Sequence, residues 1–176
     1  MKKFLQAILI GLLATSFTGC STMSPSYLVE EELKEVKTKK PEEISQQLQQ
    51  EYTDNEAINT FYKNVMGFEY KIVEEKVDGD KAAVTVEITT YPFGEKLEDA
   101  IVEAFDLALS GVEDEEVIAT KMFEKLNDVS DKTYSKKLDI SCVKKDGKWN
   151  VENLEENEEL TDALLGGMVT ISENLE

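Results

Sequence analysis

The sequence predicts an α+β domain: a curved, antiparallel four-stranded sheet packed on N-terminal helices, with a helical pair inserted between two hairpins. Helical periodicity comes first, and two pairs of segments with alternating apolar residues follow, each pair joined through Asp-Gly. Asp-Gly between alternating segments is the strongest short-range signal for a hairpin. Because helices and strands occur in separate runs, an α+β arrangement is favoured over a parallel α/β sheet.

Three helices are expected before the first strand. Ser26 is a suitable N-cap for a helix over 27–37, and Pro41 suits the first turn of a second one. The third helix is expected from about Asp54 to Gly67, because glycine commonly ends a helix. Its apolar residues recur at helical spacing and predict one buried face: Ile58, Phe61, Tyr62 and Val65.

The two hairpins are expected to turn at Asp78-Gly79 and at Asp146-Gly147, the second within "KKDGKW". Lys136 interrupts the alternation of the third strand. The most economical sheet joins the two hairpins. The apolar positions expected to face the helices are Phe68, Tyr70, Ile72, Val84, Val86, Ile88, Tyr134, Leu138, Ile140, Cys142, Trp149 and Val151.

Two amphipathic helices, separated by Ser110-Gly111, are expected between the hairpins. A last helix is expected over about 158–165, broken at Gly166-Gly167. The predicted apolar faces of the inserted pair are Leu97, Ile101, Ala104, Phe105 and Ala108 in the first helix and Val117, Ile118, Met122 and Leu126 in the second.

The N-terminus has the pattern of an export signal. Lys2 and Lys3 precede a short apolar run, and small residues lead up to Cys20. That run is shorter than the roughly 20 residues that a transmembrane helix needs. The segment Phe17-Thr18-Gly19-Cys20 resembles the lipobox of bacterial lipoproteins, with Phe17 where leucine is usual. An ordinary cleaved signal or an uncleaved helix is the alternative.

The lipobox resemblance implies that the sulfur of Cys20 receives a diacylglyceryl group and that the chain is cut just before it. Two acyl chains would hold the protein stably on a membrane. We therefore expect residues 1–19 to be a signal peptide, residues 20–26 the lipidated cysteine and its tether, and residues 27–176 a single α+β domain. The expected location is the extracytoplasmic face of a cell membrane.

The charge of the chain excludes several classes of function. It contains 19 lysines, 37 acidic residues and neither arginine nor histidine, for a net charge of −18. Such a surface repels nucleic acid and anionic lipid head groups. Without arginine there is no bidentate fork for phosphate, and without histidine the usual general base and commonest transition-metal ligand are missing. We expect no nucleic-acid partner, no cofactor and no metal centre.

Three stretches carry a resemblance to a family: "FEYKIVEEKVDGDKAAVTVEIT", "KKLDISCVKKDGKWNV" and "ELTDALLGGM". Over about residues 24–168 the order of elements resembles lipoproteins of low-GC Gram-positive bacteria that carry a cystatin-like domain of unknown function, with the cone fold of nuclear transport factor 2. The resemblance implies a curved sheet wrapped around helices, often with a pocket at the wide end, and in some relatives a homodimer through the sheet. It implies no catalytic residues, and the Asp/His or Asp/Arg pockets of enzymes with this fold cannot be formed here.

Four aromatic residues are candidates for lining such a pocket: Trp149, Tyr91, Phe93 and Tyr70. The alternative for Trp149 is a side chain that fills the core. Cys142 shares a strand face with apolar residues and is interpreted as core rather than as a reactive thiol. Ser141 and Lys144 match the S-x-x-K nucleophile motif, but in a strand a spacing of three places them on opposite faces.

The acidic clusters at 30–32, 113–116 and 152–159 are interpreted as solvated surfaces. A weak site for a divalent ion is the alternative, although Asp78-Gly79-Asp80 lacks the spacing of an EF-hand loop. With so many carboxylates, a pair at glycosidase distance has no meaning unless one member is buried with a raised pKa.

The predicted function is that of a lipid-anchored, extracytoplasmic binding or interaction module without catalytic activity. The partner would be a protein or a small apolar ligand. The alternatives are a small-molecule carrier and a carboxylate-based enzyme of the cystatin-like cone fold.

Overall fold

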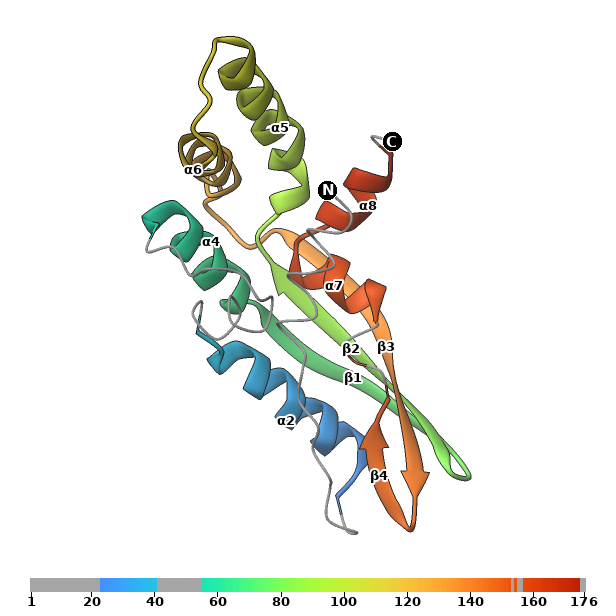
Figure 1. Ribbon diagram of the computed structural model, residues 1–176. Coiled ribbons are helices and arrows are strands. Elements are labelled where there is room, and N and C mark those ends of the chain that lie inside the picture. Colours follow the sequence, from blue (N-terminus) through green and yellow to red (C-terminus); the bar gives the residue numbers. More distant parts are fainter. Residues whose placement is uncertain (1–22, 41–54, 153, 155–156, 175–176) are drawn as a thin grey trace.

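The computed structural model describes residues 23–40, 55–152, 154 and 157–174 (Figure 1). The expected helix from Pro41 and the expected lipidation site Cys20 lie outside the described residues. The helices are α2 (Pro25–Thr38), α4 (Glu56–Met66), α5 (Phe93–Leu109), α6 (Glu115–Leu126), α7 (Glu158–Leu164) and α8 (Met168–Asn174). The strands are β1 (Glu69–Asp78), β2 (Lys81–Thr90), β3 (Tyr134–Lys145) and β4 (Lys148–Val151).

The sheet confirms the predicted α+β class and the joining of the two hairpins. Its strand order is β1-β2-β3-β4, and every neighbouring pair is antiparallel. The central pair runs in unbroken register from Lys81 opposite Val143 to Thr90 opposite Tyr134. One bulge, between Ile72 and Glu74, interrupts the β1–β2 register. Such a bulge locally increases the strand's bend and twist.

The two hairpin turns use glycine differently. In the second, Asp146 and Gly147 both have positive φ, 52° and 76°, as a type I′ turn requires. In the first, Asp78 pairs with Lys81, so the central residues are Gly79, with φ 60°, and Asp80. The first turn therefore lies one residue later than Asp78-Gly79, because the glycine takes the first central position, as in a type II′ turn.

One face of the sheet is buried and the other is polar. Along β2 the residues from Ala82 to Thr90 alternate between buried and half-buried. On the polar face, the hydroxyl of Thr85 donates to the carboxylate of Asp139. The Nζ of Lys137 lies 3.9 Å from Oε1 of Glu87. Since side chains alternate between faces, the period-two pattern alone determines which residues meet the helices.

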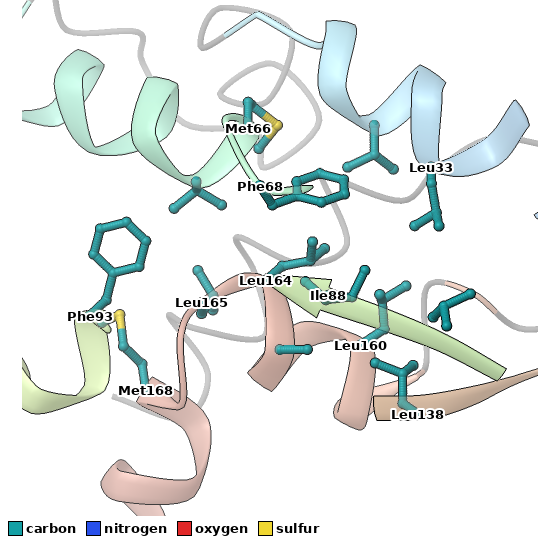
Figure 2. Close-up of a cluster of buried hydrophobic side chains, with 14 of the residues drawn as sticks. Leu33, Met66, Phe68, Ile88, Phe93, Leu138, Leu160, Leu164, Leu165 and Met168 are labelled. Atoms are coloured by element: carbon teal, nitrogen blue, oxygen red, sulfur yellow. The ribbon is translucent and has the colours of Figure 1, made fainter. Parts of the chain in front are cut away.

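The buried face of the sheet meets α2 and α7, and the core continues to the end of α4 and the start of α5. Figure 2 shows apolar side chains from these helices, from α8 and from the turns beside them gathered against apolar side chains of the sheet. The labelled residues, of which Ile88 and Leu138 belong to the sheet, are Leu33, Met66, Phe68, Ile88, Phe93, Leu138, Leu160, Leu164, Leu165 and Met168.

The start of α2 differs from the sequence prediction. Its N-cap is Ser24, whose Oγ accepts from the N–H of Tyr27, and Pro25 occupies the first helical turn. Ser26 is not the cap: its N–H and hydroxyl both donate to the carboxylate of Glu75 on β1. A proline in the first turn costs no helical hydrogen bond, because the N–H groups there have no partner within the helix. The helix can therefore begin at Pro25, two residues before the predicted start.

The C-terminal residues after Gly166-Gly167, which the sequence indicated only as moderately apolar, form α8. Met168 is buried in the main core, and α8 packs against α5. The glycine pair thus redirects the chain between two helices rather than ending the folded domain.

Candidate functional site

The residues expected to line a pocket are only partly brought together. Tyr91 and Phe93 are neighbours, with ring centroids 5.9 Å apart. Phe93 is fully buried and also lies 5.0 Å from the ring of Phe61. Tyr70 is half-buried on β1, with its ring centroid 6.2 Å from that of Phe68. These rings form part of the apolar core.

Trp149 lies at the other end of the sheet. It pairs with Lys144, whose N–H donates to the carbonyl of Asp80, whereas Tyr70 pairs with Ile88. Asp80 immediately precedes β2, and Lys81 and Ile88 are seven residues apart along that strand, a separation of about 23 Å. Trp149 is half-buried against the core, with the Lys144 ammonium 5.6 Å from its ring centroid. The four aromatic residues therefore do not form one cluster, and their role in lining a pocket stays a prediction.

The structure contains a buried charge cluster that the sequence prediction missed. Asp162 of α7 is 3% exposed. Its carboxylate accepts from Lys136 Nζ at 3.0 Å, from the Tyr134 hydroxyl at 3.2 Å, and from both the N–H and the hydroxyl of Thr170 at 2.9 Å. The cluster joins β3, α7 and α8.

The pKa values in this cluster have identifiable causes. Burial acts to raise the pKa of Asp162, but hydrogen bonds from Thr170 and Lys136 outweigh it and hold that pKa below its ordinary value. Burial, followed by the charge of Asp162, raises the pKa of Tyr134 to about 12. The carboxylate is thus ionised, paired and supplied with four donors, so it serves to fix α7 and α8 on β3 rather than to accept a proton.

Two signals in the sequence point to this cluster. Lys136 interrupts an otherwise apolar strand face, and Asp162 is the one charged residue in the segment "LTDALL". An isolated charge on each of two buried faces indicates a buried ion pair, because an unpaired buried charge is strongly unfavourable. Sequence spacing alone could not show that the two residues meet.

Cys142 is confirmed as a core residue. It is buried on β3, and burial, with smaller contributions from Glu75 and Glu152, raises the pKa of its thiol to about 12. Only the thiolate is a good nucleophile, so this cysteine is poorly reactive. Ser141 is exposed on the opposite face of the strand.

Within the described ranges, no group of three or more acidic or cysteine side chains is arranged to hold a metal ion. Among these same residues, no helix has both the length and the apolar character needed to cross a membrane.

The surface most suited to binding is an apolar stripe on α5, which we call the α5 stripe and define as Val102, Phe105 and Leu109. These side chains are 52%, 67% and 77% exposed. The sequence prediction was partly wrong here, because it placed Phe105 and Ala108 on a buried face, whereas both are exposed. The buried residues of α5 are confined to its first half: Phe93, Gly94, Leu97 and Ala100.

The α5 stripe is exposed because α5 extends beyond the end of the sheet, with α6 packed beside it (Figure 1). On α6, Leu126 is buried as expected, together with Phe123, which the prediction omitted, while Val117 is exposed. The Phe123 ring centroid lies 5.2 Å from that of Phe61 on α4. The core thus ends at the α4–α6 contact.

Polar side chains position α6 on α4. Asn127, at the C-cap of α6, donates from Nδ2 to the carbonyl of Ala57 at 2.8 Å and accepts from Asn64 Nδ2 at 3.2 Å. At the N-terminus of α4, Asn55 caps that helix and its Nδ2 donates to the hydroxyl of Thr120 on α6 at 2.6 Å. These bonds join the helical pair to the rest of the domain.

We expect Asn127→Ala to lower the free energy of unfolding by about 1–2 kcal/mol, because two half-buried hydrogen bonds are lost. Urea denaturation followed by circular dichroism would measure it. Asn150→Ala is the control. Among the described residues, the Nδ2 of Asn150 donates only to the nearby carbonyl of Lys148, so this change should alter stability by less than about 0.5 kcal/mol. Equal effects of the two changes would show that Asn127 does not hold α6 in place.

No family model and no curated protein matches the chain. Among solved structures, the chain is similar to YcdA of Bacillus subtilis subsp. subtilis str. 168, described as a "putative lipoprotein". The identity is 13% and the TM-score 0.38, and the match covers 80% of this chain and 47% of that one. This chain therefore spans about half the length of that protein, and a likeness this distant carries no statement about function.

Proposed function

We propose that this chain is a lipid-anchored, extracytoplasmic interaction module without catalytic activity of its own. The observation that carries the proposal is the α5 stripe, three large apolar side chains exposed along one line of a helix that extends beyond the sheet. Single exposed apolar residues are ordinary, but an aligned set is typical of a protein-binding surface. The partner is therefore expected to be a protein.

The sequence supports the anchor. A cationic start, a short apolar run and the lipobox-like segment ending at Cys20 are the parts of a lipoprotein signal. Ser24, the N-cap of α2, lies only four residues after Cys20. The folded domain would therefore be held close to the outer surface of the membrane.

Two buried groups support the absence of catalysis. The carboxylate of Asp162 has a lowered pKa and four donors, whereas a carboxylate serving as general acid or base needs a raised pKa and access to substrate. The thiol of Cys142 has a raised pKa and is not exposed. With neither arginine nor histidine in the chain, both observations favour binding over a carboxylate-based reaction.

The proposal includes the cystatin-like cone as the finer description of the fold. It does not include the homodimer through the sheet that the family resemblance implies. The burial of one face of the sheet supports the cone fold. The exposed, polar character of the other face, with pairs such as Thr85–Asp139, supports contact with solvent there rather than a tight apolar dimer.

Mass spectrometry of the protein isolated from its own cell membranes tests the anchor. We expect a mature chain that begins at Cys20 and carries acyl groups, and a Cys20→Ser variant that is neither acylated nor retained on membranes. Cys142→Ser provides the control, since a buried core cysteine should have no part in anchoring. A native chain with an unmodified Cys20, or turnover of an ester, glycoside or phosphate substrate abolished by a single substitution, would overturn the proposal.

A further inference from the structure

We infer that the α5 stripe binds a cationic amphipathic helix of another protein, an inference that rests on the proposed function and specifies its partner. The stripe residues recur at i, i+3 and i+7, so they share one side of the helix. Their span of seven residues is about 10 Å. That is the length over which a partner helix presents two turns of apolar anchors.

The α5 stripe is bordered by carboxylates. At about 100° per residue, Asp106 and Asp99 lie about 40° and 60° from Val102 around the helix axis, on the side away from Phe105. Glu98 lies nearly in line with Phe105, about two turns closer to the N-terminus of α5. All three acidic residues are exposed. The described part of the chain provides no ion-pair partner for any of them, because the nearby lysines Lys96 and Lys125 are paired with Asp128 and Glu103.

The acidic surroundings continue beyond the helix. The residues just before α6 and in its first turn contribute four exposed acidic side chains, at positions 113–116. An occupant of the stripe must therefore bring apolar side chains to a strongly negative surface. Positive charges that flank the apolar face of the partner would satisfy this requirement, because opposite charges at the rim of an interface guide association and align the partners.

The same charge distribution disfavours two other occupants. A second copy would place the acidic border of one α5 against that of another, in a chain whose net charge is −18, and like charges across an interface are unfavourable. An anionic membrane surface would repel the stripe for the same reason. A lysine- or arginine-rich amphipathic helix supplies both the apolar face and the opposite charge.

The test uses the full chain in phosphatidylcholine nanodiscs, with empty discs as the blank. The probe is a fluorescein-labelled amphipathic helix made of leucine and lysine, and its binding is followed by fluorescence anisotropy. The comparison peptide has the same leucine face with glutamate in place of lysine. We expect the lysine peptide to bind, the glutamate peptide not to bind, and the affinity for the lysine peptide to fall as salt is raised.

Variants separate recognition by the α5 stripe from general attraction between opposite charges. Phe105→Ser and Leu109→Ser leave the charge unchanged and should each weaken binding by about tenfold. Asp99→Asn with Asp106→Asn should weaken binding and reduce its salt dependence. Val77→Ser is the matched control, because Val77 is also exposed, at 54%, but lies on β1, and it should bind as the unchanged protein does.

Three results would overturn the inference. Binding that is unaffected by Phe105→Ser and Leu109→Ser would show attraction by charge alone. Self-association in sedimentation, abolished by Phe105→Ser, would identify a second copy as the occupant. Attachment to phosphatidylglycerol vesicles, abolished by the same change, would identify the membrane.

A photo-crosslinking residue at position 105 in living cells separates this inference from the proposed function. A crosslinked protein whose adducted segment is a lysine- or arginine-rich amphipathic helix supports both. A crosslinked protein that contacts through an acidic or uncharged segment overturns the inference and leaves the proposed function intact. The absence of any crosslinked protein overturns both.

Discussion

Replacing Gly166 by alanine is expected to lower the free energy of unfolding by about 3 kcal/mol or more. Gly166 has φ +58°, and a Cβ added there would lie 2.0 Å from the carbonyl oxygen of Tyr91 and 2.8 Å from the N–H nitrogen of Phe93. Both contacts are with backbone, which cannot rotate away. The left-handed conformation adds about 1 kcal/mol for any L-residue other than glycine, and overpacking adds about 1–3 kcal/mol.

Gly79→Ala separates these two contributions. Gly79 has nearly the same φ, +60°, but a Cβ there would meet nothing within 4 Å. Its replacement should therefore cost only the conformational term, about 1 kcal/mol. Chemical denaturation of the two variants measures the difference. If Gly79→Ala were as destabilising as Gly166→Ala, the close approach of the α7–α8 turn to the β2–α5 connection would not explain the glycine.

Replacing Asp162 by asparagine is expected to cost about 3 kcal/mol at neutral pH. The two carboxylate oxygens accept from four donors, three at Oδ2 and one at Oδ1. In asparagine one of these oxygens is replaced by an NH₂ group, which would face hydrogen-bond donors and could not accept from them. The substitution also removes the negative charge that balances Lys136. Losing one member of a buried ion pair typically costs about 3–5 kcal/mol, and the partial exposure of Lys136 favours the lower end.

The cost should depend on pH in a defined direction. Because the pKa of Asp162 is lowered in the folded state, its contribution is fully present above the unfolded pKa of about 4 and is lost as the pH falls through the folded value. The difference in unfolding free energy between the unchanged protein and Asp162→Asn should therefore shrink below about pH 4. Denaturation curves at neutral and acidic pH measure it.

Asp139→Asn serves as the control for this experiment. Asp139 is exposed on β3 and accepts from the hydroxyl of Thr85. Its replacement should change stability by less than about 0.5 kcal/mol. A cost for Asp162→Asn that stayed constant from neutral to acidic pH would show that the ionised carboxylate is not what stabilises the α7–α8 turn.

Short-range patterns in the sequence predicted most of the sheet. Alternation along β2 predicted a buried face with Val84, Val86 and Ile88, and the glycines predicted both hairpins. These predictions succeed because the side-chain period of a strand and the positive φ of a tight turn are local properties. The first turn was misplaced by one residue, since local preference alone does not decide whether glycine is the first or the second central residue.

Predictions of burial on helices were less successful where the helix leaves the core. Leu97 and Phe105 both lie on the apolar side of α5 in the sequence pattern, yet only Leu97 is buried. Periodicity identifies a helix with an apolar side, but it does not reveal how much of the helix is covered. The exposure of the candidate site, the α5 stripe, therefore depends on where the sheet ends relative to α5, and the helical pattern does not contain that information.

By itself, the sequence determined the class of the domain, the pairing of its hairpins, the core position of Cys142 and the chemistry that a chain without arginine and histidine lacks. These follow from residue type and from contacts within a few residues. Only the tertiary structure decided that Lys136 meets Asp162, that Trp149 lies far from Tyr70, and that Phe105 faces solvent. The physical reason is that each depends on which segments, distant in the chain, pack together and where that packing ends.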